Sequence, residues 1–185
     1  MRISALGMVT VLTALSLTTN GGISTPSSAA AEKVPTTGGA APGSLADDPY
    51  QKRFCTALHS LMQAADHGFA TLRAAPKKGR DHVWTAKLAV PGGTDCVIFG
   101  GEPAAYTCDL YAGDIEATSD DAYLDASARL KACLPEGWTS KEKVDGAHAR
   151  TLASGHPSGQ SIRIVERDAS ADAYLVEFWF DAAKK

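Results

Sequence analysis

The chain lacks an excess of basic residues. It has 18 Lys and Arg residues against 21 Asp and Glu residues, which gives a formal net charge of −3. Nucleic acid requires a basic face on its protein partner, because its phosphates dominate the interaction. The charge balance therefore argues against nucleic acid as a ligand, and equally against an anionic membrane surface.

Motifs for metal or redox chemistry are also lacking. The four cysteines form no Cys-x-x-Cys, which argues against a thioredoxin-type redox role. The five histidines, at positions 59, 67, 82, 148 and 156, lack the close spacing of a zinc helix or ribbon. Only His67 and His82 flank a common loop. We therefore expect ordinary surface histidines, with no metal site and no cofactor.

The chain has no recognisable catalytic motif. In residues 155–159 the serine is fourth rather than third, so Gly-x-Ser-x-Gly is not formed, and a predicted strand follows rather than a helix. The glycine pairs at 92–93 and 100–101 precede no helix that would hold a phosphate, and they are typical of hairpin turns. The acidic pairs at 47–48 and 120–121 suit helix capping. We predict no catalytic residue.

No apolar run reaches the roughly 20 residues of a membrane span. Arg2 precedes a shorter apolar run over residues 3–17, and small residues follow, ending in three alanines at 29–31. This layout predicts a secretory signal over residues 1–31, with cleavage nearer Asn20 as a second possibility and an uncleaved anchor as the alternative. Cleavage after residue 31 removes Arg2 alone among charged residues, which leaves a net charge of −4 and no membrane span.

The remaining chain predicts a flexible linker followed by one domain. Residues 32–46 are rich in Pro, Thr, Gly, Ala and Ser, and they offer too little apolar surface to offset the entropy of ordering. A single domain is expected over residues 47–185. Four cysteines in an exported chain most simply form two disulfides. We therefore expect an exported protein that is periplasmic or extracellular.

Residues 83–111 are the clearest structural signal. Three alternating runs are separated by two turns rich in Gly and Pro, which predicts a β-meander. One set of alternate positions is apolar and is expected to face the core: Trp84, Ala86, Leu88, Val90, Cys96, Ile98, Tyr106, Cys108 and Leu110. A hairpin centred on Glu102 places Cys96 opposite Cys108, so these two cysteines are predicted to form a disulfide.

Two helices are predicted on either side of the meander. Asp48 and Pro49 have the character of an N-cap and a first helical residue, and residues 118–121 are expected to cap the second helix. Cys55 and Cys133 each lie on the apolar stripe of one helix. Because both stripes face the same sheet, Cys55–Cys133 is the predicted second disulfide.

Two further strands are predicted over residues 161–167 and 173–180, and a third at 148–153 is possible. A turn centred on Ser170 pairs Ile164 with Val176, Ile162 with Phe178 and Arg163 with Glu177. The expected fold is two-layer α+β, with an antiparallel sheet of 5–6 strands, two helices on one face and the order α-βββ-α-ββ(β). This arrangement resembles the two-layer α+β architecture of bacterial secretion chaperones over residues 48–181, without a shared motif, and arrangement alone implies no function.

The sheet face opposite the core carries large apolar side chains among charged ones. Its candidate binding residues are Val97, Phe99, Tyr111, Val165, Leu175, Trp179, Arg163 and Arg167. Clustered exposed apolar groups usually mark interaction sites, although a solvated face is the alternative. We therefore expect a bacterial-type binding protein, inhibitor-, immunity- or chaperone-like, whose partner is another protein or a second copy. A small cell-envelope hydrolase and a structural envelope component are the alternatives.

Overall fold

The structure is a computed structural model that describes residues 48–146, 149–170 and 173–184. The predicted signal over residues 1–31 and the linker over residues 32–46 lie outside the described residues. So does His148, which stands at the start of one predicted strand.

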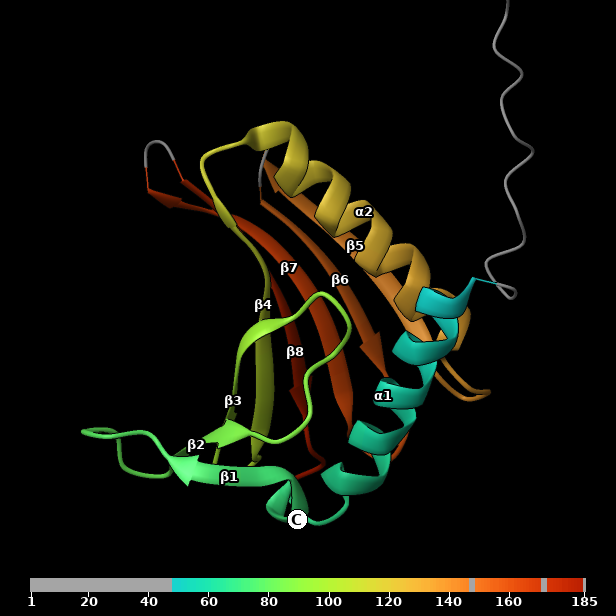
Figure 1. The fold of residues 1–185 in the computed structure, drawn as a ribbon. Coiled ribbons are helices and arrows are strands. Elements are labelled where there is room, and N and C mark those ends of the chain that lie inside the picture. Colours follow the sequence, from blue (N-terminus) through green and yellow to red (C-terminus); the bar gives the residue numbers. More distant parts are fainter. Residues whose placement is uncertain (1–47, 147–148, 171–172, 185) are drawn as a thin grey trace, which may run out of the picture. The chain divides into compact units, whose positions relative to one another are not determined.

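The described residues form one antiparallel sheet of eight strands together with two α-helices (Figure 1). The strand order is β1-β2-β3-β4-β8-β7-β6-β5. In chain order the elements are α1 (Pro49–Ala65), the short 3-10 helix η2 (Ala70–Leu72), β1 (Arg73–Pro76), β2 (Val83–Ala86), β3 (Thr94–Phe99), β4 (Ala105–Gly113), α2 (Glu116–Cys133), β5 (Thr139–Gly146), β6 (Ala149–Gly155), β7 (Ser161–Ser170) and β8 (Ala173–Asp181). The α+β class is therefore confirmed.

The predicted number of 5–6 strands is wrong, because two edge strands were missed. Strand β1 has three exposed residues out of four and ends in Pro76, and every residue of β5 is exposed. Neither strand has the alternation of buried and exposed residues on which sequence reading depends. Charged side chains and proline are common at such edges, where they discourage pairing with another chain.

The helices also differ from the expected placement. Each helix is followed by four strands, so the order is α-ββββ-α-ββββ. Helix α2 lies against β4, β7 and β8, whereas α1 packs mainly against α2 and η2. It reaches the sheet through Phe54, whose ring meets that of Phe178 edge-on at 6.4 Å between centroids. Among the described residues, no helix is both long enough and apolar enough to cross a membrane.

The N-terminal caps of the two helices were predicted, and one of the two predictions is confirmed. Asp48 caps α1 as predicted, because its side chain accepts a hydrogen bond from the Tyr50 amide at 2.9 Å. Helix α2 instead begins at Glu116 after Ile115, which provides no side-chain cap, so the predicted cap at residues 118–121 is wrong. The Ser119 hydroxyl donates a hydrogen bond to the Glu166 carboxylate. Ser119 therefore contacts the sheet instead of capping its own helix.

Both predicted disulfides are present. Ile98 pairs with Tyr106 across β3 and β4, so the hairpin is centred on Glu102 and the Cys96–Cys108 bond joins facing residues. Cys55–Cys133 joins α1 to α2 with 5.1 Å between the Cα atoms. Apolar stripes and hairpin symmetry were sufficient to find both pairs.

The predicted register of β7 and β8 is wrong by two residues. Ile164 pairs with Phe178, Ile162 with Phe180 and Arg163 with Trp179. The turn therefore lies further along the chain than Ser170. Because side chains alternate with a period of two, this shift leaves each residue on its expected face.

The core lies between the helices and the sheet, and it forms one cluster. Its largest fully buried side chains come from both layers: Phe54, Leu58, Leu61, Phe69, Ile98, Tyr106, Tyr123, Leu130, Leu152, Ile162, Phe178 and Phe180. The opposite side of the sheet, called the outer face below, is the side on which alternate residues of β3, β4, β8 and β7 point away from the helices.

Candidate functional site

Seven of the eight predicted binding residues lie on three strands of the outer face, β3, β8 and β7. Strand β3 contributes Val97 and Phe99, and β8 contributes Leu175 and Trp179. Strand β7 contributes Arg163, Val165 and Arg167. Since β3, β4, β8 and β7 are consecutive in the sheet, these side chains share one surface.

Phe99 and Trp179 form a stacked aromatic pair on this surface, near the ends of β3 and β8. Their ring centroids are 6.1 Å apart and their planes differ by 7°. The two strands that carry them flank β4, so the rings meet above β4. The small residues Ala105 and Thr107 of β4 are only 9% and 6% exposed, and the Thr107 hydroxyl has no hydrogen-bond partner among the described residues. The aromatic pair therefore covers the Thr107 hydroxyl, whose burial is not offset by a hydrogen bond among the described residues.

Arg163 borders the aromatic pair. Its guanidinium lies over the Trp179 ring at 5.5 Å from the centroid, and its Nη2 forms an ion pair with the Asp181 carboxylate at 2.9 Å. Ser161 donates a further hydrogen bond to the same carboxylate oxygen at 3.1 Å. These contacts hold the indole in one orientation, and the cation adds to the attraction.

Two acidic side chains of the outer face, Asp109 and Glu177, lie on neighbouring strands, and only one of them has a cation as a partner. Asp109 of β4 stands opposite Glu177 of β8 in the sheet register. Glu177 accepts a hydrogen bond from Arg167 at 3.1 Å. The Asp109 carboxylate has no ion-pair partner within the described ranges. Burial raises the pKa of Asp109, and the charges of Glu177 and Asp95 raise it further. This face therefore presents one carboxylate that lacks a cation.

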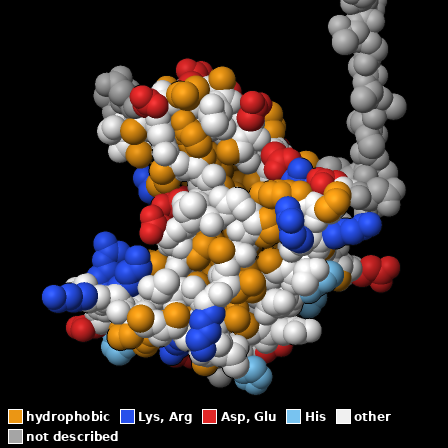
Figure 2. All heavy atoms as spheres, viewed as in Figure 1, with side chains coloured by type: hydrophobic (Ala, Val, Ile, Leu, Met, Phe, Trp, Pro, Cys, Tyr) orange, Lys and Arg blue, Asp and Glu red, His pale blue; other side chains and the backbone are white. Residues whose placement is uncertain are grey.

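Cations of this chain compensate Asp109 only from a distance. Arg167 and Lys77 lower its pKa, but by less than burial and the two neighbouring acids raise it. Lys77 belongs to the loop between β1 and β2, and Figure 2 shows Lys and Arg side chains gathered at the tip of that hairpin. A closer cation would have to come from outside the described residues.

The raised pKa gives a test of this electrostatic reading. The folded state favours protonated Asp109, so the ionised form destabilises the fold at neutral pH, and the penalty is relieved as the pH falls towards the ordinary value of 3.8. We expect Asp109→Asn to raise the midpoint of urea unfolding at neutral pH, with a gain that shrinks as the pH is lowered to about 4. The exposed Asp81 offers the control Asp81→Asn. A variant less stable at neutral pH would mean that the carboxylate makes a favourable contact.

Tyr111 does not belong to the outer face, so that prediction is wrong. The pairing of β4 with β8 shifts between Asp109 and Tyr111, and Tyr111 then stands opposite Val176, which faces the core. The Tyr111 hydroxyl donates to the carbonyl of Ile115 at 3.1 Å and accepts from its amide at 2.9 Å. Tyr111 therefore anchors the start of α2. A bulge adds one residue to a strand, and counting alternate positions does not reveal it.

A buried ion pair within the sheet, which also contacts α2, was missed by sequence reading. Glu166 of β7 has a fully buried side chain, with 0% exposure, and it accepts hydrogen bonds from Arg150 of β6 and from Ser119 of α2. Arg150 also pairs with Asp120 of α2. These contacts raise the pKa of Arg150, chiefly through the bond to Glu166. The signal in the sequence was Glu166 itself, which shares the inward alternation of Ile162 and Ile164.

Tyr123 extends this ion pair towards β5. The Arg150 guanidinium lies 4.5 Å from the centroid of the Tyr123 ring, and the Tyr123 hydroxyl donates to Glu142 at 2.8 Å. Burial raises the pKa of Tyr123, and the hydrogen bond to Glu142 raises it further. Because these groups satisfy one another, we interpret the cluster as the fastening of α2 to the sheet.

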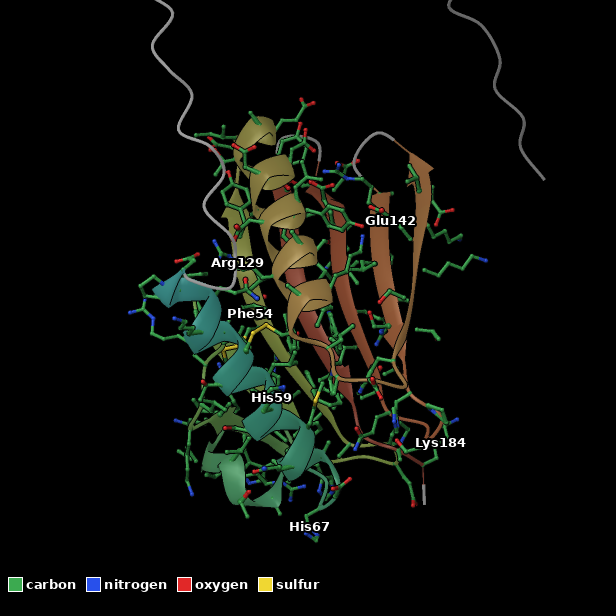
Figure 3. All side chains as sticks on the ribbon, turned by 90° about the vertical axis from the view of Figure 1, so that its right-hand side faces the viewer. Phe54, His59, His67, Arg129, Glu142 and Lys184 are labelled. Carbon is green, nitrogen blue, oxygen red and sulfur yellow. A yellow bond between two sulfur atoms is a disulfide. The ribbon has the colours of Figure 1, made fainter. Side chains whose placement is uncertain are left out.

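A second polar contact fastens α1 to α2. Figure 3 shows Arg129 of α2 and Phe54 of α1 close to the point where the two helices meet. Arg129 pairs with Asp48 at 2.6 Å and with Asp125 at 2.7 Å, and its guanidinium lies 4.4 Å from the centroid of the Tyr50 ring. These hydrogen bonds raise the pKa of Arg129, and that from Arg129 lowers the pKa of Asp48.

The described histidines and Ser158 are the candidates for metal binding and catalysis, and only His156 lies close to a nucleophile. Within the described residues, no three His, Cys, Asp or Glu side chains are placed to hold a metal ion. His156 Nδ1 lies 2.8 Å from the Ser158 hydroxyl, but the same nitrogen also accepts the Ser158 amide at 3.2 Å. These contacts join residues two apart in the sequence and are typical of a local turn. No described carboxylate orients the imidazole as a catalytic triad requires.

No protein-family model, no curated protein and no solved structure matches this chain. We therefore argue its function from the contacts of its own residues.

Proposed function

We propose that this protein is an exported binding domain whose outer sheet face receives a partner protein. The observation that carries the proposal is the stacked pair Phe99 and Trp179, which is half-buried on the outer face and has charged side chains around it. Aromatic anchors surrounded by polar groups are the usual composition of binding hot spots. Two disulfides are compatible with export, as is the expected secretory signal.

The charges on this face favour a partner segment that combines an apolar side chain with a basic one. Arg163 and Arg167 are already paired with Asp181 and Glu177. Asp109 has no ion-pair partner among the described residues, and two acids raise its pKa. A partner's Lys or Arg beside Asp109 would remove that penalty, while its apolar side chain covers the aromatic pair. The expected net charge of −4 without residues 1–31 makes a second copy of this acidic chain the weaker choice of partner.

Truncating either member of the aromatic pair is expected to weaken binding and leave the fold intact. Stacking of two aromatic rings contributes about 0.5–1.5 kcal/mol, so Phe99→Ala and Trp179→Ala should still fold. A hot-spot residue contributes about 2 kcal/mol or more to binding, and its loss weakens affinity by about thirtyfold. The measurement is affinity capture from the envelope and culture medium of the native organism, followed by titration calorimetry with the captured protein.

Leu124 gives the matched control for this experiment. It is a large apolar side chain, 55% exposed, and it lies on α2 in the other layer of the fold. The proposal requires a partner that wild type and Leu124→Ala retain and that both aromatic variants lose. It also requires Asp109→Lys to weaken binding at low salt more than at high salt. A partner that all variants retain would contradict the proposed face, and a dimer dissociated by Trp179→Ala would identify self-association instead.

A further inference from the structure

A cavity of about 380 Å³ lies at the end of the molecule where α1 ends. Its lining comes from the end of α1 and the residues after it, from the turn between β3 and β4, and from the C-terminal residues (Figure 3, in which His67 marks this end). Most of the wall is small: Ala65, Gly68, Gly100, Gly101, Ala104, Ala182 and Ala183. The charged side chains Arg73 and Glu102 line the same space.

Arg73 is held in place with donors to spare. Its Nη2 donates to the carbonyl of Gly68 at 3.0 Å, and its guanidinium lies 4.1 Å from the centroid of the Trp84 ring. Its Nε is buried and lacks a hydrogen-bond partner, and Arg73 forms no ion pair within the described part of the chain. The guanidinium is fixed on an aromatic face, and its Nη1 makes no hydrogen bond among the described residues, so it is suited to a carboxylate.

Glu102 supplies the opposite charge without neutralising Arg73. It is exposed in the turn between β3 and β4, and it has no ion-pair partner among the described residues. Its negative charge would repel a simple anion from the cavity, just as Arg73 would repel a simple cation. Two opposite charges that line one cavity without touching are complementary to a ligand that carries both.

We propose that this cavity binds a small zwitterion, an α-amino acid or a dipeptide, with the ligand carboxylate on Arg73 and its ammonium group near Glu102. The volume is at the lower end of the range for small-molecule sites, which is about 300–1,000 Å³. The small residues of the wall let a ligand backbone approach closely, and they provide no large apolar subsite for a bulky side chain. This site is independent of the proposed partner surface.

The test is a set of NMR titrations of the ¹⁵N-labelled domain with four probes. L-alanyl-L-alanine and L-alanine carry both charges, propionate lacks the ammonium group, and ethylammonium lacks the carboxylate. We expect saturable shifts at the Trp84 indole and at Gly100 and Gly101, with a dissociation constant of about 1 mM for a zwitterion and at least about tenfold weaker binding of the single-charge probes. The two zwitterions distinguish an amino-acid site from a dipeptide site.

Variants separate the proposed contacts from effects on folding. Arg73→Gln and Glu102→Gln should each weaken zwitterion binding at least about tenfold, and Arg73→Lys should fall between, because an ammonium group lacks the planar fork. Arg53→Gln is the matched control, since Arg53 is exposed and also lies over an aromatic ring, that of Tyr50. Any of three results would overturn the proposal. Propionate could bind as tightly as alanine, Glu102→Gln could bind a zwitterion more tightly than the wild type does, or no probe could shift any resonance. Because Glu102 is exposed, its variant tests the site even if Arg73→Gln unfolds.

Discussion

Replacing Cys55 and Cys133 together by alanine is expected to destabilise the domain by about 4 kcal/mol. The bond closes a loop with a sequence separation of 78, so its loss frees a long segment of the unfolded chain. The Cys96–Cys108 bond spans a separation of only 12, and its removal should cost about 3 kcal/mol in the same chain-entropy description. The longer bond should therefore contribute more to stability.

The surroundings of the two bonds reinforce this ranking. Gln51 is only 3% exposed, and its amide donates to Cys133 Sγ at 2.8 Å and to the Arg129 carbonyl at 3.1 Å. Loss of the sulfur leaves this buried amide with fewer acceptors at the junction of α1 and α2. Strands β3 and β4, by contrast, stay paired by their own hydrogen bonds after Cys96–Cys108 is removed.

Urea unfolding of the two double-alanine variants under one set of conditions provides the measurement. The midpoint should fall further for Cys55→Ala/Cys133→Ala than for Cys96→Ala/Cys108→Ala, and thiol reductant should shift the wild type by at least the larger amount. Equal midpoints for both variants would show that loop length does not govern their stability, and a reversed order would place the main constraint in the hairpin.

The disulfides could be predicted because both follow from local periodicity. Cys55 and Cys133 lie at helical spacing among apolar residues, and Cys96 and Cys108 are equidistant from the turn at Glu102. The outer-face positions of Phe99 and Trp179 follow from alternation in the same way. Each of these positions depends on neighbours within one element or one hairpin. Cys55 is then paired with Cys133 because both apolar stripes face the same sheet and because these two cysteines are left once Cys96 is joined to Cys108.

Features that depend on distant partners could not be predicted from the pattern. Strand β5 was missed because an exposed edge strand needs no buried alternation. The Tyr111 position was wrong because a bulge in β4 is fixed by pairing with β8. The cavity next to Arg73 was not expected, since Arg73 and Glu102 approach one space only after the sheet has formed. Ser119 was assigned to a cap because its acceptor, Glu166, is 47 residues away.

That same Glu166 carries the second large prediction: Arg150→Met is expected to destabilise the domain by about 3–5 kcal/mol. The substitution leaves a fully buried carboxylate with the Ser119 hydroxyl as its remaining donor among the described contacts. It also removes the cation from the face of Tyr123 and the partner of Asp120. An uncompensated charge inside a core costs far more than an ion pair contributes, so one missing partner should matter greatly.

The double variant Arg150→Met/Glu166→Leu separates burial of a lone charge from loss of packing. Replacing both partners by apolar groups of similar volume is often neutral, so the double variant should recover most of the stability that Arg150→Met loses. Lys143→Ala is the control on the neighbouring edge strand, because the Lys143–Asp145 pair is 71% and 55% exposed and should contribute less than about 1 kcal/mol. Urea unfolding of the three variants tests the argument. If the double variant is as unstable as Arg150→Met, the cost comes from the lost contacts of Arg150 with Tyr123 and Asp120 rather than from the isolated charge of Glu166.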